Sequence, residues 1–378
     1  MSDTAYVAKT MIAPRTAPVR TTGVLGFVRS RLLNSPTNIL LTIACILLLW
    51  FTIIPTITFL LVDAVWHGSD RNACLPENVG RPVGACWPFI EAKLSQFIYG
   101  FYPEAERWRV DLTFLIGVLL LLPLLIPRVP AKVINAALFF LAFPFVAFFL
   151  LHGGYGGLQV VPTRLWGGML VTLVVAITGI VASMPIGIAL ALGRRSSIPL
   201  IRYGSIAFIE FWRGVPLITV LFFATYMLPL FLPGNFTVDG LVRVLIGVAL
   251  FAGAYNAEVI RGGLNAIPRG QAEAASALGL SWWKTTRLVV LPQALRHVIP
   301  GLVNSFIALL KDTSLVSIVA LFDLLGQLRA AFADPAWSSP STLFTGFAFT
   351  GIIYFVLCFG MSRYSLFVEH RLNAHRRS

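Results

Sequence analysis

Six ionisable residues occur as three close pairs inside, or at the ends of, long apolar segments: Glu210 and Arg213, Glu258 and Arg261, and Lys311 and Asp312. A charge inside a membrane is costly, so such residues usually face one another, a partner or a water-filled cavity. Residues three positions apart share one face of a helix, which applies to the first two pairs. The six residues are therefore either salt bridges and gate contacts between helices, or contacts for a charged ligand.

The other polar residues show no pattern typical of a nucleotide, metal or catalytic site. Thr313 and Ser314 directly follow the third pair, and their hydroxyls either join the same site or bond back to the helix backbone. The chain lacks a Gly-x-x-x-x-Gly-Lys-Ser/Thr phosphate-binding loop. The five histidines form no clustered metal or catalytic pattern: His67, His152, His297, His370 and His375. We therefore expect no catalytic residue, no metal and no cofactor in this chain, which disfavours an integral-membrane enzyme.

The segments that carry these residues are long and apolar. Only 12% of the 378 residues are charged and 57% are hydrophobic, whereas about 25% charged residues is usual for a soluble domain. Lipid supplies no water to backbone groups, and the segments lack alternating polarity, so they must be helices. We predict an all-α polytopic membrane protein with about eight transmembrane helices: Asn38–Val62, Leu112–Ile126, Val133–Leu151, Leu165–Leu192, Ser205–Leu232, Leu241–Ile260, Pro300–Leu321 and Leu343–Phe367.

Positive charges gather in alternate loops and at both ends of the chain. Examples are Arg29, Arg31, Arg128, Lys132, Arg194, Arg195, Arg202, Arg269, Lys284, Arg287, Arg296, Arg371, Arg376 and Arg377. Cytoplasmic loops carry such an excess, so we expect these loops and both termini to be cytoplasmic. The formal net charge of +13 then requires no nucleic-acid partner. The first long apolar run starts late and lacks a small-residue cleavage site, so no cleavable signal peptide is expected.

Two of the four cysteines share one polar loop. Cys74 and Cys86 lie in the segment 63–110, which the predicted topology places outside, in an oxidising compartment. A disulfide between them is expected there. The alternative is two free thiols in a cytoplasmic loop, which requires the opposite topology. Cys45 and Cys358 lie inside apolar runs and are expected to be inert.

Four blocks in the second half of the chain share a recognisable order. The first opens at Gly167-Gly168 and closes through Arg194-Arg195-Ser196; the second is Glu210 to Leu217, with Arg213-Gly214-Val215-Pro216. The third runs from Ala254 to Gly263 and leads into Gln271–Gly279, followed by Leu291-Pro292; the fourth is Lys311 to Leu315. From about Arg164 onward, the chain resembles the polar-amino-acid type of ABC importer permease. Two positions depart mildly from that pattern: Val215, where Thr is usual, and Val289, where Ile is commoner.

The resemblance implies how the chain is divided. A five-helix permease core would occupy 164–370, preceded by a cytoplasmic tail (1–37) and a three-helix extension (38–163), and followed by a second tail (371–378). The long extension with its large outer loop resembles the permease subunits of general L-amino-acid transport systems.

The loop 261–299 would carry the EAA motif, through which such a permease docks on its ATPase. The residues implied in coupling are Glu273, Ala274, Ala275, Gly279, Leu291 and Pro292. Pro268 suits a helix start, the alanines allow close approach of another protein, and Gly279 can adopt the left-handed conformation that ends a helix. Ser281 can cap a second short helix. The alternative is an ordinary amphipathic interfacial helix.

The resemblance also implies partners and a location. ATP and Mg would be bound by two copies of a separate ABC ATPase, and a second, similar permease would complete a heterodimer. A periplasmic binding protein would deliver an amino acid across a bacterial inner membrane. Arg213 can then receive the carboxylate, and Glu210, Glu258 or Asp312 the ammonium. The alternative function is an ion-gradient-driven secondary transporter, which predicts inverted repeats that this sequence does not display.

Overall fold

The computed structural model describes residues 23–126, 129–231, 233 and 238–374. Most of the predicted first tail (1–22), the end of the second (375–378), and Arg128, Arg376 and Arg377 lie outside these residues. Within the described residues the regular secondary structure is helical, and paired extended backbone is limited to three isolated bridges. The prediction of an all-α chain is confirmed.

The first half of the chain forms the extension. Its helices are α1 (Gly23–Phe27), α2 (Pro36–Ile57), α3 (Pro76–Val79), α4 (Trp87–Tyr99), α5 (Arg107–Leu125), α6 (Lys132–Ala137) and α7 (Phe143–His152). Wider π-helical turns occupy Val28–Leu32, Thr58–Val62 and Leu138–Ala142. Tighter 3-10 turns occupy Arg71–Cys74, Glu104–Glu106 and Thr163–Leu165. The helix α4 inside the outer loop was not anticipated from the sequence.

The second half forms a bundle. Its helices are α8 (Gly168–Gly193), α9 (Pro199–Gly214), α10 (Leu217–Phe222), α11 (Leu228–Phe231), α12 (Gly240–Ala266), α13 (Arg269–Ala277), α14 (Trp282–Thr285), α15 (Leu291–Asp312), α16 (Leu324–Ala331) and α17 (Pro340–Ala374). π-helical turns cover Phe223–Met227 and Thr286–Val290, and a 3-10 segment covers Thr313–Val319. The described residues include seven helices long and apolar enough to span a membrane, or eight if the bent pair below is one span.

The fifth predicted span is not one straight helix. α9 and the segment Leu217–Phe231 meet at an angle of 102°. Pro216 cannot donate a backbone hydrogen bond, and Val215 before it is extended, as the residue before a proline prefers to be. The predicted span Ser205–Leu232 is therefore bent at Pro216, as a proline inside an apolar run favours.

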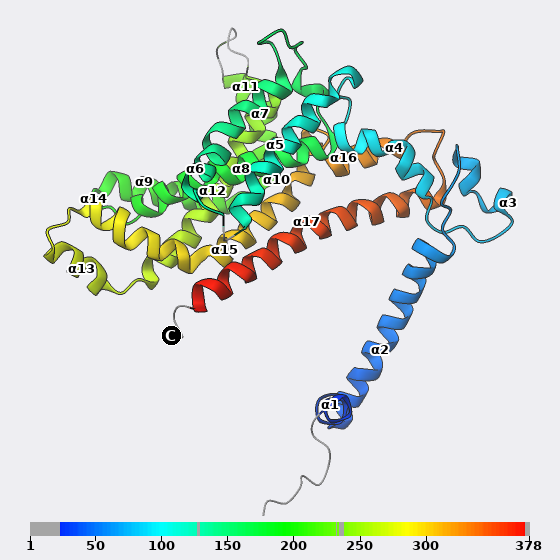
Figure 1. Cartoon of the computed structure of the whole chain (residues 1–378), viewed down its shortest axis with the longest axis horizontal. Helices are drawn as coiled ribbons and strands as arrows, with labels where there is room; N and C mark the ends of the chain where they lie inside the picture. The colour runs from blue at the N-terminus through cyan, green and yellow to red at the C-terminus, as the bar shows by residue number, and fades with distance from the viewer. Residues whose placement is uncertain (1–22, 127–128, 232, 234–237, 375–378) are drawn as a thin grey trace, which may run out of the picture.

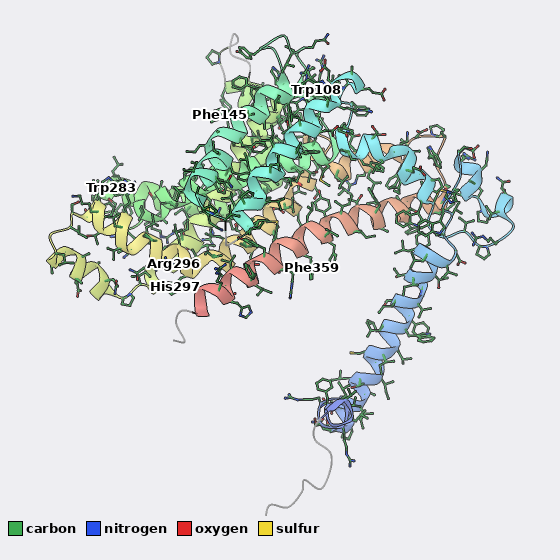
Figure 2. All side chains as sticks on the ribbon, in the orientation of Figure 1. Trp108, Phe145, Trp283, Arg296, His297 and Phe359 are labelled. Atoms are coloured by element: carbon green, nitrogen blue, oxygen red, sulfur yellow. A yellow bond between two sulfur atoms is a disulfide. The ribbon has the colours of Figure 1, made fainter. Side chains whose placement is uncertain are left out.

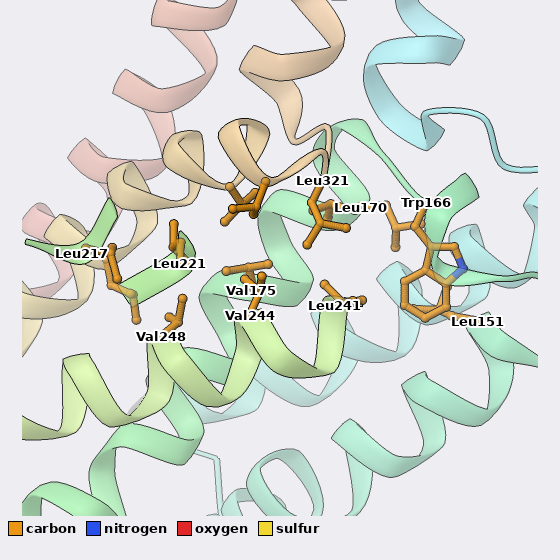
Figure 3. Packing of buried hydrophobic residues seen from close by; sticks show 14 of the residues in the cluster. Leu151, Trp166, Leu170, Val175, Leu217, Leu221, Leu241, Val244, Val248 and Leu321 are labelled. Carbon is orange, nitrogen blue, oxygen red and sulfur yellow. The ribbon is translucent and has the colours of Figure 1, made fainter. Parts of the chain in front are cut away.

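The centre of the bundle is a close crossing of α8 and α12. A Cβ added to Gly187 would lie 3.0 Å from the Cβ of Asn256, and one added to Gly253 would lie 2.5 Å from Ile186. Small residues thus allow the two helices to approach closely, as is typical of membrane helices. Figure 3 shows apolar side chains of α8, α10 and α12 meeting in one buried cluster: Leu170, Val175, Leu217, Leu221, Leu241, Val244 and Val248.

Helix α2 projects away from the rest of the molecule (Figure 1). It has no buried residue. The π-helical turn that follows it is fixed, since the N–H of Ala85 donates to the carbonyl of Phe59 (2.7 Å) and the indole of Trp87 donates to the carbonyl of Leu60 (3.1 Å). The hydroxyls of Thr52 and Thr56 donate to carbonyls within the helix. A helix that is apolar all round, with its polar groups satisfied internally, suits hydrocarbon.

The segment 63–110, which the sequence predicts to be the outer loop, is folded and closed by a disulfide between Cys74 and Cys86, whose Cα atoms are 5.7 Å apart. Both cysteines are buried, and the N–H of Cys86 donates to the hydroxyl of Thr345 on α17 (2.8 Å). On α4, Lys93 forms an ion pair with Asp334, which holds the pKa of that carboxyl below its ordinary value. The loop therefore packs on the bundle.

The disulfide gives a direct prediction. Intact mass measured after alkylation without reductant should show Cys74 and Cys86 unmodified, whereas prior reduction should add two labels. Replacing both with serine should lower the free energy of unfolding by about 3 kcal/mol in the chain-entropy model, because the loop is no longer closed. Four alkylated thiols in the untreated, denatured protein, instead of the two of Cys45 and Cys358, would contradict the pairing.

Candidate coupling and transport sites

A short helix, a tight turn and a second short helix form one exposed projection, α13 to α14, hereafter the knob (residues 269–285). The N–H of Gly279 donates to the carbonyl of Ser276 (2.9 Å), and the N–H of Leu280 donates to that of Ala275 (3.1 Å). These two bonds, with Gly279 at φ +77°, make a Schellman helix end. The local sequence therefore fixes the direction in which α14 leaves α13.

One expectation about this turn needs correction, and the role of Gly279 can be stated more closely. Ser281 occupies the N-cap position of α14, but its side chain makes no capping hydrogen bond. A side chain at position 279 would not collide with the protein, since an added Cβ has no atom within 4 Å. The need for glycine is conformational, because other residues pay about 1–2 kcal/mol to adopt the left-handed region.

The outer surface of the knob is available to a partner. Glu273 and Ala274 are exposed, whereas Ala275 is buried against the turn. Leu278 is 83% exposed, and the exposed rings of Trp282 and Trp283 stack 5.3 Å apart. Figure 2 shows Trp283 at one edge of the molecule. A rigid projection with exposed apolar groups and small residues is suited to insertion into a groove of another protein.

The knob is tied to the membrane helices at its base. Leu291-Pro292 begins α15, with the proline in the first turn, where its missing N–H costs no helical bond. The side-chain amide of Gln293 donates to Gln271 in α13 (3.2 Å). An added Cβ at Gly263 of α12 would lie 2.7 Å from the carbonyl oxygen of Ala294, so α12 and α15 are in close contact there. Displacement of the knob is therefore transmitted to both helices.

A network of five charged residues lies near the same end of the bundle, with Glu258 at its centre. Arg261 donates to both carboxylate oxygens of Glu258 (2.9–3.1 Å). Arg194 donates to Glu258 and to Glu210, each at 3.0 Å, and Arg213 lies 3.7 Å from Glu258. The network joins the end of α8 to α9 and α12, and it contains three guanidinium groups for two carboxylates.

The sequence placed four of these residues among the candidates but treated Arg194 only as a loop charge. Arg194 comes near Glu258, 64 positions away, only because α8 and α12 cross, and no local spacing signals that contact. Glu210 and Arg213 share a helix, yet Glu210 bonds to Arg194 instead. The guanidinium of Arg213 stacks over the ring of Tyr255, 5.6 Å from its centre.

The remaining candidates lie at the end of α15 and the start of the 3-10 segment after it, and three of them line two different pockets. Asp312 lines a pocket of about 390 Å³ between α12 and α15, which Tyr255 also lines. Lys311 and Ser314 line a second pocket of about 280 Å³ against α16 and α17. Thr313 is buried, and its hydroxyl donates back to the carbonyl of Leu310 (2.8 Å). Neighbours in sequence are thus directed to opposite sides of α15.

Tyr255 connects the two groups of candidates, because its ring contacts Arg213 and forms part of the wall of the pocket containing Asp312. Arg213 does not itself line this pocket, so Tyr255 is its link to it. Among the described residues, no group of three His, Cys, Asp or Glu side chains is arranged to hold a metal ion.

Comparison with known proteins gives close relatives along the whole chain. The inner membrane amino-acid ABC transporter permease protein YhdY of Escherichia coli K12 is 48% identical over 96% of this chain and 97% of its own length. The glutamate/glutamine/aspartate/asparagine transport system permease protein BztC of Rhodobacter capsulatus is 38% identical, and the match covers all of both chains. A crystal structure of an amino acid ABC transporter with histidines aligns with 54% of this chain and 92% of its own, at 30% identity and a TM-score of 0.47.

The matching family model is described as the binding-protein-dependent transport system inner membrane component, and it covers residues 183–374, from within α8 through α17. That range contains the knob, the Glu258 network and both pockets. With the model spanning about half of the chain and the Escherichia coli relative matching nearly all of it, this chain belongs to the family of binding-protein-dependent transport system inner membrane components.

Proposed function

We propose that this chain is the permease subunit of an ABC importer that moves L-amino acids across a bacterial inner membrane. The observation that carries the proposal is the knob, a rigid exposed turn fixed to α12 and α15. It is suited to receive force from a separate ATPase and to pass it to the helices that line the larger pocket. The names of the two long relatives, both amino-acid permeases, support the substrate class.

The assembly we propose contains this chain, a second similar permease, two ATPase copies and a periplasmic amino-acid-binding protein, with ATP and Mg held by the ATPase. Coexpression of these components and reconstitution in liposomes provides the test. Uptake of labelled amino acids should require the binding protein and ATP, and should cease with an ATPase that cannot hydrolyse ATP. Uptake that instead follows an imposed ion gradient without ATP would favour a secondary transporter.

We further propose that Arg213 and Asp312 lie along the solute pathway. Asp312→Asn removes the charge at constant side-chain size, and Arg213→Gln removes the charge with a shorter polar side chain. If these residues contact the solute, each variant should change the preference among acidic, neutral and basic amino acids, while ATP hydrolysis without solute stays normal. If they act as gates, basal hydrolysis should change and uptake of every solute should fall alike. Side chains shown to face lipid in the assembled importer would contradict both roles.

The proposed topology places both termini and the knob in the cytoplasm, as the positive-charge distribution favours. Ser276→Cys introduces an exposed thiol on α13. In intact cells, a membrane-impermeant maleimide should leave this thiol unlabelled, and permeabilised cells should label it. Labelling in intact cells would show that the orientation is the opposite one, and it would exclude docking of the knob on a cytoplasmic ATPase.

A further inference from the structure

The extension and the family core share one buried cluster at the outer end of the molecule. Figure 1 shows α4 lying beside α16, in the region opposite α13. Phe89, Ile90 and Phe97 from α4 pack with Leu324 and Leu328 from α16, and all five are buried. α16 belongs to the core, so the extension completes the packing of a core element.

The backbone contact between the two parts is as close as glycine allows. A Cβ added to Gly168, the first residue of α8, would lie 2.2 Å from the carbonyl oxygen of Phe97. One added to Gly100 would lie 2.4 Å from the Cα of Gly167, and the N–H of Phe101 donates to the carbonyl of Leu165 (3.1 Å). A movement of the end of α4 toward α8 would therefore push the start of α8 out of its place.

A polar contact crosses this apolar junction. The amide of Gln96 on α4 donates to the side-chain oxygen of Gln327 on α16 (3.0 Å), and Gln327 is fully buried. The Gln327 side-chain nitrogen has no hydrogen-bond partner among the described residues, so Gln96 supplies the one partner its buried amide has there. A buried polar contact of this kind fixes relative position, because leaving the amide unpaired is costly.

The contact continues from α16 into the middle of the bundle. Asp323, fully buried, accepts hydrogen bonds from the N–H groups of Leu325 and Gly326 and so caps α16. Its carboxylate also accepts from the hydroxyl of Tyr354 on α17 (3.1 Å), and that hydroxyl lies 3.4 Å from the hydroxyl of Thr313. The series therefore ends beside the segment that faces both pockets.

We infer that α4 of the extension is a positioning element for the transport core, acting through these five residues, hereafter the outer clasp: Gln96, Gln327, Asp323, Tyr354 and Thr313. The clasp holds α16 and α17 against the segment 311–314 and so sets the shape of the pocket lined by Lys311 and Tyr354. The inference rests on the proposed function only in treating the core as a transport core. The constraint that the extension places on α16 does not depend on that function.

The test compares two changes on α4 in the reconstituted complex. Gln96→Leu removes the amide and leaves Gln327 unpaired, whereas Lys93→Met removes the partly exposed ion pair to Asp334 and leaves the clasp intact. Gln96→Leu should speed amide hydrogen exchange in residues 323–331 and lower uptake about tenfold, as expected for loss of a buried hydrogen bond. Lys93→Met should change both quantities little, because exposed ion pairs contribute weakly.

Tyr354→Phe tests the clasp at a second residue, since it removes only the hydroxyl that joins Asp323 to Thr313. It should lower uptake in the same direction, and the double variant with Gln96→Leu should fall short of the product of the two single effects, because the two residues act through one clasp. The inference is overturned if Gln96→Leu shows normal uptake and normal exchange. It is also overturned if the double variant loses the full product of the two single losses of uptake, or if Lys93→Met has effects as large as those of Gln96→Leu. If Gln96→Leu fails to assemble, normal uptake by Tyr354→Phe overturns it.

The exchange measurement separates this inference from the proposed function. It is made on the assembled complex and requires no assumption about the solute. If the wild-type complex imports no amino acid but Gln96→Leu still releases α16, the proposed function fails and the clasp stands. If amino-acid uptake is normal in both the wild type and Gln96→Leu, the clasp fails and the function stands.

Discussion

Replacing Gly279 with leucine should abolish uptake and weaken association with the ATPase while leaving the subunit folded in the membrane. Position 279 has φ +77°, and a residue with a Cβ pays about 1–2 kcal/mol to remain there. The added side chain also stands on the exposed surface of the knob, where no atom of this chain would meet it but a docked partner would. Copurification of the ATPase with the permease and ATP-driven uptake in liposomes measure the two effects.

A matched pair of variants separates conformation from bulk. Gly279→Asn adds a side chain that tolerates the left-handed region, so it should retain part of the uptake. Gly279→Val adds a side chain of similar size that does not tolerate this region, so it should behave like leucine. If leucine at 279 supports normal assembly and transport, the knob is not the coupling element. If asparagine and valine are equally inactive, bulk at the interface matters more than the turn.

Replacing Glu258 with glutamine should have the second largest effect. Glu258 is the shared partner of Arg194, Arg213 and Arg261, and its side chain is only 16% exposed. Removing one member of a buried charge pair typically costs about 3–5 kcal/mol; the lower end applies here because the arginines are partly exposed. We expect a reduced yield of folded complex, more than tenfold slower uptake per complex, and raised basal ATP hydrolysis as α8, α9 and α12 separate.

Glu210→Gln is the matched control, because it makes the same chemical change in the same network. Glu210 is 57% exposed and its one ion pair among the described residues is with Arg194, so its loss should reduce uptake only slightly. Basal hydrolysis, uptake and thermal unfolding of the complex should be measured side by side for the two variants. Equal behaviour would show that Glu258 is not the centre of the network.

Local features of the site were predictable from the sequence, and features made by distant segments were not. The turn at Gly279 follows from spacing within ten residues, and the Glu258–Arg261 pair follows from helical geometry. The Arg194–Glu258 contact depends on a helix crossing that no short pattern encodes. The same holds for α4, whose place against α16 comes from tertiary packing.

The fold shows the same division. Long apolar runs identified the spans, because hydrocarbon leaves the backbone little choice. The break at Val215-Pro216 lies inside such a run, and the proline signals a kink there without giving its angle of 102°. There the apolar pattern and the local backbone preference disagreed, and the backbone preference determined the structure.

The isolation of α2 bears on how the chain is made. Because α2 has no buried residue and bonds its hydroxyls internally, it needs no other helix to leave the translocon and enter the bilayer. Among the described residues, it precedes every other helix long enough to span a membrane. In the proposed topology it would lead the outer loop out of the cytoplasm, where oxidation can join Cys74 and Cys86 before α16 and α17 emerge from the ribosome. The disulfide-closed loop would then already be folded when α16 and α17, which pack on it, are synthesised.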